Sequence, residues 1–426
     1  MSDAGRWLQA ARALDDWMRA RNFAGHDPFD LLASPLVRRL CFGLRWPAVA
    51  WTQLGKRSPV QLRGVLRVPR QRNPKGIGLV LAAYVRLLRA TGDAAYLARA
   101  ADLVAWLSAV ARREYGGAGW GYPFPWANRA FQVPAHTPAS VPTAFIGHAL
   151  FDAAQAGIPG ARELAFDAAA FLAAALPRLP APDGSFCFAY TPLDRRGVHN
   201  ASILAASVLA RAAAAGGAGE WAEAAAAAAR HTLAAQAPDG SWPYGTGRRD
   251  GWVDSFHTGY ILLALAELRR SLSTPAPGAP ALEDAIARGA AYWRRAFLVG
   301  PAVAFHPGAA YPIETHAVAH AILTLLALPE HFPDGRAQAE RLGEWCLREA
   351  RDPAGHFHYR HGRRIRNRLP YMRWVQAWML RALAELAAFA AGVPAPGGAG
   401  GATATPAPPP PPAGEPAAIP AVRGDR

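Results

Sequence analysis

Lysine is nearly absent from this sequence of 426 residues. Only Lys56 and Lys75 are lysines, so 44 of the 46 basic residues are arginine, and the formal net charge is +15. Because alanine, glycine and proline are abundant as well, we interpret this balance as compositional drift rather than as a sign of nucleic-acid binding. No motif combines aromatic and basic residues in the manner of a nucleic-acid module, so the predicted partners do not include nucleic acid.

Cysteine usage and hydropathy exclude further classes. The three cysteines, Cys41, Cys187 and Cys346, form no CxxC pair, which argues against a disulfide framework and a cysteine zinc site and fits a reducing compartment. The N-terminal helix pattern carries charges throughout and lacks the apolar core of a secretory signal. No uninterrupted apolar run of about 18 residues occurs. The sequence therefore predicts a cytoplasmic protein without a membrane span.

What the sequence does contain is a repeated turn rich in glycine and aromatic residues. Its leading aromatic recurs roughly every 60 residues, and a pair of helical patterns lies between successive copies. Such a repeat indicates an α-hairpin that must stack on its neighbours to cover its apolar surface. The turns are GWGYPFPW (119–126), DGSFCFAY (183–190), DGSWPYG (239–245), VAFHPG (303–308) and GHFHYRHG (355–362).

Counting these hairpins predicts the architecture. Five pairs lie within 76–351, and a last helix at 371–391 pairs with the first helix at 5–20 to close a ring. The predicted fold class is therefore all-α, an (α/α)6 toroid. We expect it to form one domain over residues 1–391.

Two segments depart from the repeat. Residues 45–75 are predicted to be irregular because they contain four prolines. Residues 392–426 are nearly pure Pro, Ala and Gly, which cannot bury a core, so they are predicted to be a disordered tail.

The ring architecture predicts where a site lies. Each turn leads into the N-terminus of an inner helix, so the loops converge at one end, where helix termini add partial positive charge. Four of the five loops carry arginine, which predicts an anionic ligand such as a uronate or a phosphorylated sugar. An arginine-rich chain would also place arginine in any exposed loop, and that explanation stays open. The predicted substrate-binding residues are Trp126, Arg129, His199, Asn200, Arg248, Arg249, Arg373 and Trp374.

The candidate catalytic residues fit two chemistries. In the first, Asp254 and Glu314, from adjacent hairpins, are the general acid and base of a glycosidase. In the second, His257 or His316 removes the proton beside a uronate carboxylate, and Tyr371 acts as the acid.

Asn200 and Arg373 would neutralise that carboxylate in the second chemistry, which is that of a polysaccharide lyase or a sugar epimerase. Asp254 also fits a helix N-cap and His257 a buried core histidine, so each residue has a structural explanation as well.

No metal or cofactor is predicted. His316 and His320 are spaced as two metal-ligating histidines on one helix face, but no cysteine and no HExxH motif accompanies them. The oligomeric state is left open.

One short motif resembles that of another toroid family. Gln236-x3-Gly240-x-Trp242 is similar to the QW signature of terpenoid cyclases, and the ring resembles both that superfamily and the six-hairpin glycosidases. The acidic DxDD and DDxxD motifs that those cyclases need are missing. We therefore interpret QxxxGxW as a structural device at a helix end.

A longer resemblance spans about residues 20–385. It is to a bacterial family found with exopolysaccharide and capsule biosynthesis genes, whose members are often labelled delta-aminolevulinic acid dehydratase. That enzyme is a (β/α)8 barrel with two Schiff-base lysines, whereas Lys56 and Lys75 here lie outside any strand pattern. The resemblance implies a link to surface polysaccharide and carries over no catalytic residues. It rests on GHDPFDLLASPL, GWGYPFPW, DGSFCFAYTPLD, DGSWPYG, VDSFHTGY, YPIETHAVAH and YMRWVQAWML.

The functional prediction combines these observations. We expect a carbohydrate-active enzyme of surface polysaccharide biosynthesis that acts on an anionic, uronate-like glycan or sugar by hydrolysis, elimination or epimerisation. One alternative is a non-catalytic glycan-binding or scaffold protein of the same machinery. The other is an isoprenoid cyclase or prenyltransferase-like toroid, which would need an apolar, aromatic-lined cavity rather than one ringed by arginines.

Overall fold

Helices dominate the fold. The computed structural model describes residues 3–127, 132–272 and 279–394, and within these ranges no helix combines the length and hydropathy needed to cross a membrane. The inner helices are α4 (Pro74–Thr91), α6 (Ser140–Gln155), α8 (His199–Ala214), α10 (Ser255–Ser271), α12 (Thr315–Ala327) and α14 (Trp378–Ala390). Their outer partners are α5 (Ala94–Val110), α7 (Ala161–Ala174), α9 (Gly219–Ala234), α11 (Ala279–Phe297), α13 (Gly335–Trp345) and α1 (Asp3–Arg19).

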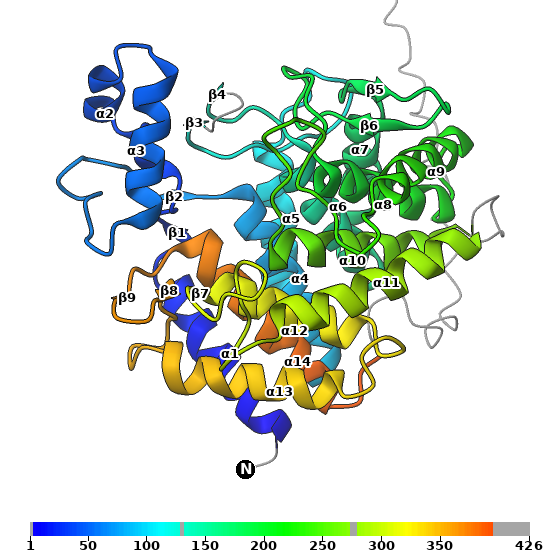
Figure 1. The fold of residues 1–426 in the computed structure, drawn as a ribbon. Helices are drawn as coiled ribbons and strands as arrows, with labels where there is room; N and C mark the ends of the chain where they lie inside the picture. The colour runs from blue at the N-terminus through cyan, green and yellow to red at the C-terminus, as the bar shows by residue number, and fades with distance from the viewer. Residues whose placement is uncertain (1–2, 128–131, 273–278, 395–426) are drawn as a thin grey trace, which may run out of the picture.

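These twelve helices close into a ring (Figure 1). Each inner helix packs on the next in chain order, from α4 through α6, α8, α10 and α12 to α14, and α14 packs back on α4. The first helix, α1, packs on the last, α14. The predicted (α/α)6 toroid is confirmed, including the pairing of first helix with last.

The hairpin of α4 and α5 illustrates how the sequence sets these elements. The Asn73 side chain caps α4, and Pro74 occupies its first turn, where a missing N–H costs nothing. The helix ends at Gly92 with φ of +68°, and Asp93 caps α5. Fourteen residues of α4 are buried but only five of α5. This difference is the one expected between an inner and an outer helix.

The repeated turns anchor each hairpin to the next. Trp120 donates its indole N–H to the carbonyl of Leu107, at 2.9 Å, and Trp242 donates to Thr232, also at 2.9 Å. Each carbonyl lies in the last turn of an outer helix, where the usual backbone donor four residues on is missing. The two leading tryptophans therefore tie their turns to the ends of the preceding outer helices.

Short strands fix the loops at the same end of the ring. They are β1 (Ala24–Gly25) with β2 (Gln71–Arg72), β3 (Trp126–Ala127) with β4 (Gln132–Val133), β5 (Arg178–Pro180) with β6 (Phe186–Phe188), and β7 (Ile313–Glu314) with β8 (Arg360–His361) and β9 (Arg366–Asn367). All of these pairs are antiparallel.

A helical extension lies beside the ring (Figure 1). It contains the 3-10 turn η1 (Asp30–Ala33), α2 (Pro35–Leu40) and α3 (Arg45–Arg57). The prediction that residues 45–75 are irregular is wrong over α3. Pro47 falls in the first turn of that helix, where proline neither removes a hydrogen bond nor clashes with a preceding turn.

The last inner helix begins irregularly. A π-helical turn, η3 (Met372–Ala377), leads into α14, and a second one, η2 (Cys346–Ala350), follows α13. π-helical turns are rare in proteins, and those that occur are often found at functional sites.

Two predictions stay as they were. The predicted tail lies outside the described residues from 395 onward. The assignment of residues 1–391 to one domain remains a prediction.

Candidate functional site

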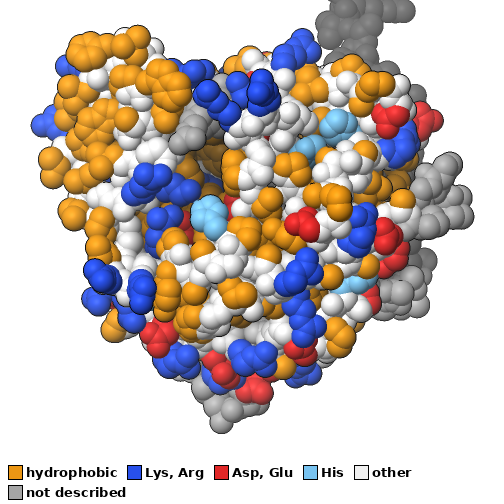
Figure 2. Space-filling view, viewed as in Figure 1, with side chains coloured by type: hydrophobic (Ala, Val, Ile, Leu, Met, Phe, Trp, Pro, Cys, Tyr) orange, Lys and Arg blue, Asp and Glu red, His pale blue; other side chains and the backbone are white. Residues whose placement is uncertain are grey.

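A cavity of about 1120 Å³ opens between α3 and the N-terminal end of the ring. Five inner segments contribute a residue near their start: Lys75, Val141, Asn200, His257 and Arg373. The space-filling view shows the hollow between the extension and the ring (Figure 2). The loops therefore converge at one end, as the repeat predicts.

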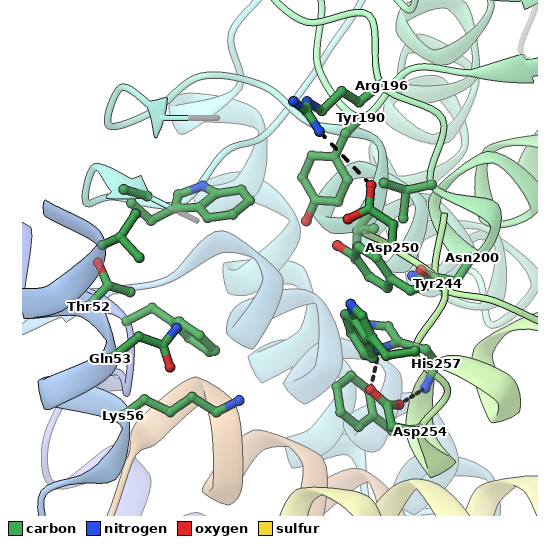
Figure 3. A pocket seen from close by; sticks show the side chains of 18 of the residues that line it. Thr52, Gln53, Lys56, Tyr190, Arg196, Asn200, Tyr244, Asp250, Asp254 and His257 are labelled. Carbon is green, nitrogen blue, oxygen red and sulfur yellow. Dashed lines mark hydrogen bonds and ion pairs between the residues drawn. The ribbon is translucent and has the colours of Figure 1, made fainter. Parts of the chain in front are cut away.

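The extension forms the wall opposite the ring. Thr52, Gln53 and Lys56 of α3 face His257 and Asp254 across the cavity (Figure 3). The cavity is therefore bounded by the extension on one side and by the ring on the other.

Asp254 and His257 form a pair at the start of α10. One carboxylate oxygen of Asp254 accepts the backbone N–H of His257 at 2.8 Å and so caps the helix. The other lies 2.7 Å from Nδ1 of His257. Asp254 is buried, whereas the His257 ring borders the cavity. Because Nδ1 is held by the carboxylate, Nε2 is the ring nitrogen left to act on a ligand.

A chain of buried polar groups runs beneath this pair. The Tyr260 hydroxyl lies 3.1 Å from Nε2 of His316 and 3.5 Å from Nζ of Lys75. Burial raises the pKa of Tyr260 well above its usual range. Burial, with the nearby Arg373 guanidinium, holds the pKa of Lys75 well below its usual range. Such shifts gather at functional sites.

Aromatic rings surround the Lys75 ammonium. Its nitrogen lies 4.2 Å from the ring centre of Phe145, 5.1 Å from that of Tyr260 and 5.4 Å from that of Trp378. These contacts partly replace the water lost on burial, because an aromatic face attracts a cation.

Basic side chains outnumber acidic ones in the lining. It holds two carboxylates, Asp250 and Asp254. Within the described residues, no carboxylate lies within ion-pair distance of Arg248 or Arg249. The cavity therefore favours an anionic ligand electrostatically. The basic residues are Arg45, Lys56, Arg57, Lys75, Arg196, Arg248, Arg249 and Arg373.

Arg373 already has a partner. Its Nε and Nη2 lie 2.6 and 2.7 Å from the two carboxylate oxygens of Asp27. Both side chains are buried. Its charge is thus neutralised within the protein, although the residue lines the cavity.

The lining is also rich in aromatic rings. Tyr244 stacks on Trp252 with ring centres 4.2 Å apart, and both rings meet the edge of His257. Rings of this kind provide apolar faces for stacking against a sugar while keeping a polar tip exposed.

Eight of the predicted site residues line the cavity, and four lie elsewhere. The eight are Trp126, Asn200, Arg248, Arg249, Asp254, His257, Arg373 and Trp374. Glu314 is fully buried, where it accepts from Trp374 and Tyr359 and pairs with Arg360. These three partners satisfy the buried Glu314 carboxylate without a ligand.

His316, Tyr371 and His199 are buried away from the cavity lining. Burial and Lys75 hold the pKa of His316 well below its usual range. The Tyr371 hydroxyl accepts from Arg63 at 2.9 Å. His199 stacks on His231 with ring centres 5.7 Å apart. Arg129 lies outside the described residues.

Sequence reasoning missed the contribution of the extension. Lys56 and Gln53 enter the site from α3, a helix that belongs to no repeat. Tyr244 and Trp252 were visible in the loop before α10 but could not be separated from the plugging aromatics.

One possible metal-ligating group lies outside the cavity. Asp352, His356 and His358 each offer a ligand atom, and these atoms lie within 4.8 Å of one another. No residue of this group lines the cavity.

Comparison with known proteins finds similarity in fold. No protein-family model and no curated protein matches the chain. Solved structures do match. A cellobiose 2-epimerase from Bacillus thermoamylovorans has a TM-score of 0.57 at 10% identity, covering 74% of this chain and 87% of its own. An α-mannanase of glycoside hydrolase family 76 from Bacteroides thetaiotaomicron has a TM-score of 0.55 at 13% identity, covering 74% and 86%.

A third similar structure is an unsaturated glucuronyl hydrolase specific for heparin. Its TM-score is 0.51 at 13% identity, covering 75% of this chain and 88% of its own. The likeness is one of architecture. At these identities the comparisons show a shared (α/α)6 fold and leave the reaction to be argued from the site.

Proposed function

We propose that this protein is a carbohydrate-active enzyme that moves a proton on an anionic, uronate-like sugar or glycan. The observation that carries the proposal is the His257–Asp254 pair, held at 2.7 Å on the wall of a large cavity lined mainly by basic and aromatic side chains. The named activities of the similar folds, which include an epimerase and a glucuronyl hydrolase, agree with a sugar ligand.

The positions of the carboxylates favour proton abstraction over hydrolysis. A glycosidase needs two carboxyl groups that flank the scissile bond. Glu314, one of the two candidates, is enclosed by Trp374, Tyr359 and Arg360. His257 instead has a geometry suited to a general base, because Asp254 fixes its orientation and stabilises the imidazolium that forms.

The reaction requires a group that stabilises negative charge. When Nε2 of His257 takes the proton on the carbon beside a carboxylate, the electron pair of that C–H bond passes into the carboxylate. Arg248, Arg249 and Lys56 supply positive charge in the cavity for this step.

Two outcomes follow from the same intermediate. Return of a proton to the opposite face gives the epimer. Departure of the substituent on the next carbon gives an unsaturated sugar, with the electron pair forming the new double bond. We assign the second proton-transfer role to Tyr260, a residue of the cavity lining one turn after His257.

The link to surface-polysaccharide assembly belongs to the same proposal. It rests on the resemblance of the sequence to a family found with such genes. Non-catalytic glycan binding is the second candidate, favoured by the aromatic lining around Tyr244 and Trp252. The basic lining argues against an isoprenoid cyclase. Among the described residues the lining contains only two carboxylates, Asp250 and Asp254, whereas those cyclases need acidic motifs.

The test is proton exchange. The protein is incubated in deuterium oxide with uronic-acid monosaccharides and oligosaccharides, and deuterium in the recovered sugar is measured by mass spectrometry. We expect incorporation, or absorbance of an unsaturated uronate, with wild type and not with His257→Ala. His306→Ala, at a second histidine of the lining, is the matched control. Binding without exchange in wild type would instead support the glycan-binding candidate.

A further inference from the structure

The helical extension exposes an apolar surface. Eight of the exposed large hydrophobic residues lie within residues 36–65. Figure 2 shows hydrophobic side chains gathered over the extension. Exposed apolar patches of this kind mark interaction sites in monomeric proteins. They are Leu36, Leu40, Phe42, Leu44, Trp46, Leu54, Val60 and Val65.

This exposure does not mean that α2 and α3 are poorly packed. The opposite face of α2 and α3 has a small core of its own, formed by Leu32, Val37, Cys41, Ala48 and Val49 with neighbours. The pair of helices α2 and α3 is therefore amphipathic, packed on one face and unpartnered on the other.

After Asp30, the charged residues of the extension are all basic. Between Asp30 and Asp93 the sequence contains no acidic residue, and residues 31–72 carry nine basic ones. Arg38 and Arg39 are exposed in α2, beside the apolar Leu40 and Phe42. An anionic partner therefore complements this surface.

We propose that the extension docks on the surface of a membrane that contains anionic lipids. Phe42 and Leu44, in the turn between α2 and α3, enter the boundary between headgroups and acyl chains, and the flanking arginines bind lipid phosphates. Arginine suits this position because its apolar stem lies along the lipid while its charged head stays with the phosphates.

Two other occupants fit less well. A second copy would place the same patch on both sides of an isologous interface, so the exposed Arg38 and Arg39 of one copy would face those of the other. Nucleic acid would satisfy the charge but leave the Phe42 and Leu44 side chains in water.

The experiment is co-sedimentation of the full chain with vesicles. Vesicles of phosphatidylcholine are compared with vesicles that also contain phosphatidylglycerol. We expect binding that requires phosphatidylglycerol and that falls about thirtyfold in Arg38→Ala/Arg39→Ala, since each basic residue near an anionic surface contributes about 1 kcal/mol. Phe42→Ser/Leu44→Ser should also lose binding.

The control is a matched apolar pair elsewhere on the surface. Leu193 and Ile365 are 62% and 67% exposed, close to the 61% of Leu44, so Leu193→Ser/Ile365→Ser should bind as wild type does. Failure of wild type to sediment with anionic vesicles overturns the proposal. So does a wild-type dimer that the Phe42→Ser/Leu44→Ser variant converts to monomer, because the patch would then be a protein interface.

A separate observation concerns Asp352, His356 and His358. Nε2 of His358 lies 3.3 Å from one carboxylate oxygen of Asp352, and Nδ1 of His356 lies 3.9 Å from the other. Nδ1 of His356 is buried and has no hydrogen-bond partner among the described residues. His358 is 7% exposed.

The internal repeat provides a comparison for this turn. In three turns the backbone N–H of the first residue donates to the carbonyl four residues on: Ala181 to Ser185, Ala237 to Ser241, and Asp352 to His356, at 2.8 to 2.9 Å. A glycine with positive φ precedes each acceptor residue. The same turn thus forms with alanine and serine, so its geometry does not require Asp352 and His356.

We infer that these three residues bind a divalent transition metal, Zn²⁺ in the first instance. Two imidazoles and one carboxylate form a ligand set that zinc accepts, with water in the fourth position. The oxygen-preferring Mg²⁺ and Ca²⁺ are not expected to bind. The site would tie the turn together beside α1, where His356 lies against Trp17 with ring centres 4.8 Å apart.

The test is zinc titration of the metal-free protein against a chromogenic chelator, together with thermal unfolding. We expect one Zn²⁺ per chain and a raised Tm, with no effect of Mg²⁺. Asp352→Ala/His356→Ser introduces the residues that the other two turns carry, so it should fold and lose both effects. His331→Ala, a histidine outside the group, should retain both. Equal zinc binding by the double variant and wild type would overturn the inference.

Discussion

Arg373 holds both carboxylate oxygens of Asp27, 346 positions earlier in the chain. Next to this pair, Arg63 binds Asp30 at 2.6 Å and the hydroxyl of Tyr371 at 2.9 Å. These buried contacts join the start of the extension to the π-helical turn η3. They therefore fix the distance between the two walls of the cavity.

Breaking this pair should destabilise the protein. Asp27→Ala leaves the Arg373 charge buried and unpaired, which typically costs about 3–5 kcal/mol. We expect a loss of this size in the free energy of unfolding, measured in urea. Asp284→Ala, which removes the partner of Arg288 on the exposed face of α11, should change it by less than about 1 kcal/mol. Equal effects would show that the buried pair does not brace the site.

Asp254→Asn should separate the two roles of Asp254. Asparagine is as good an N-cap as aspartate, so the stability should change little. Its amide cannot stabilise an imidazolium at His257, so we expect the proposed proton exchange to slow by about 10³- to 10⁴-fold. Exchange rates across a pH series and urea unfolding measure the two roles independently. A loss of stability without a change in exchange would contradict the assignment of His257 as base.

Arg248 and Arg249 should determine the affinity for an anionic sugar. Each Arg→Ala change should weaken uronate binding by about 10- to 150-fold, because a hydrogen bond to a charged group typically contributes 1.5–3 kcal/mol. The effect should shrink at high salt. Calorimetry at two salt concentrations measures both. Arg195→Ala is the control, since Arg195 lies in an equivalent loop but outside the cavity lining; a similar loss there would indicate a general charge effect.

Buried histidines should make the protein acid-sensitive. Burial lowers the pKa of His199 to about 4 and that of His320 to about 3. In the unfolded chain each has a pKa near 6.5, so between about pH 6.5 and 4 only the unfolded chain takes up these protons. Stability is therefore complete above about pH 6.5 and falls as the pH decreases, by up to about 1.4 kcal/mol per pH unit for each histidine.

His320→Gln should weaken that dependence. Urea unfolding between pH 7 and pH 4 should give a shallower slope for the variant than for wild type, whereas His306→Gln, at an exposed histidine, should leave the slope unchanged. Parallel slopes for all three proteins would contradict a neutral, buried His320.

Gly289 should be intolerant of any side chain. A Cβ at this position of α11 would lie 2.6 Å from Cη2 of the plugging Trp242. We expect Gly289→Ala to destabilise the protein by about 1–3 kcal/mol through overpacking. Gly219→Ala, in α9, has no atom within 4 Å of the new carbon and should be neutral or stabilising. Thermal unfolding of both variants compares them directly.

The ring could be predicted from the sequence because its signals are local. Gly92 and Asp93 mark a helix boundary by their own backbone and capping preferences, and the turns repeat often enough to count the hairpins. The position of α3 could not be predicted, because it depends on contacts such as Arg63 with Asp30, between residues 33 positions apart. No periodicity in the sequence encodes such a pairing.

The site shows the same division. Asp254 is the N-cap of α10 and His257 lies in its first turn, so the sequence could place both at the same end of the ring. Whether Glu314 faces the cavity depends on Trp374, Tyr359 and Arg360, which reach it from another hairpin. Spacing along the chain places a residue at the right end of the ring but does not say which of its neighbours cover it.

The pairing of α1 with α14 also determines when the ring can close during translation. α1 is the first helix of the ring to leave the ribosome, and α14 is the last. Trp7 and Leu14, fully buried in the finished ring, cannot complete their packing until residues 378–390 have emerged. Five hairpins can therefore stack as they are made, while the sixth joins the two ends of the chain, and a nascent chain that stops before α14 has a ring with two open edges.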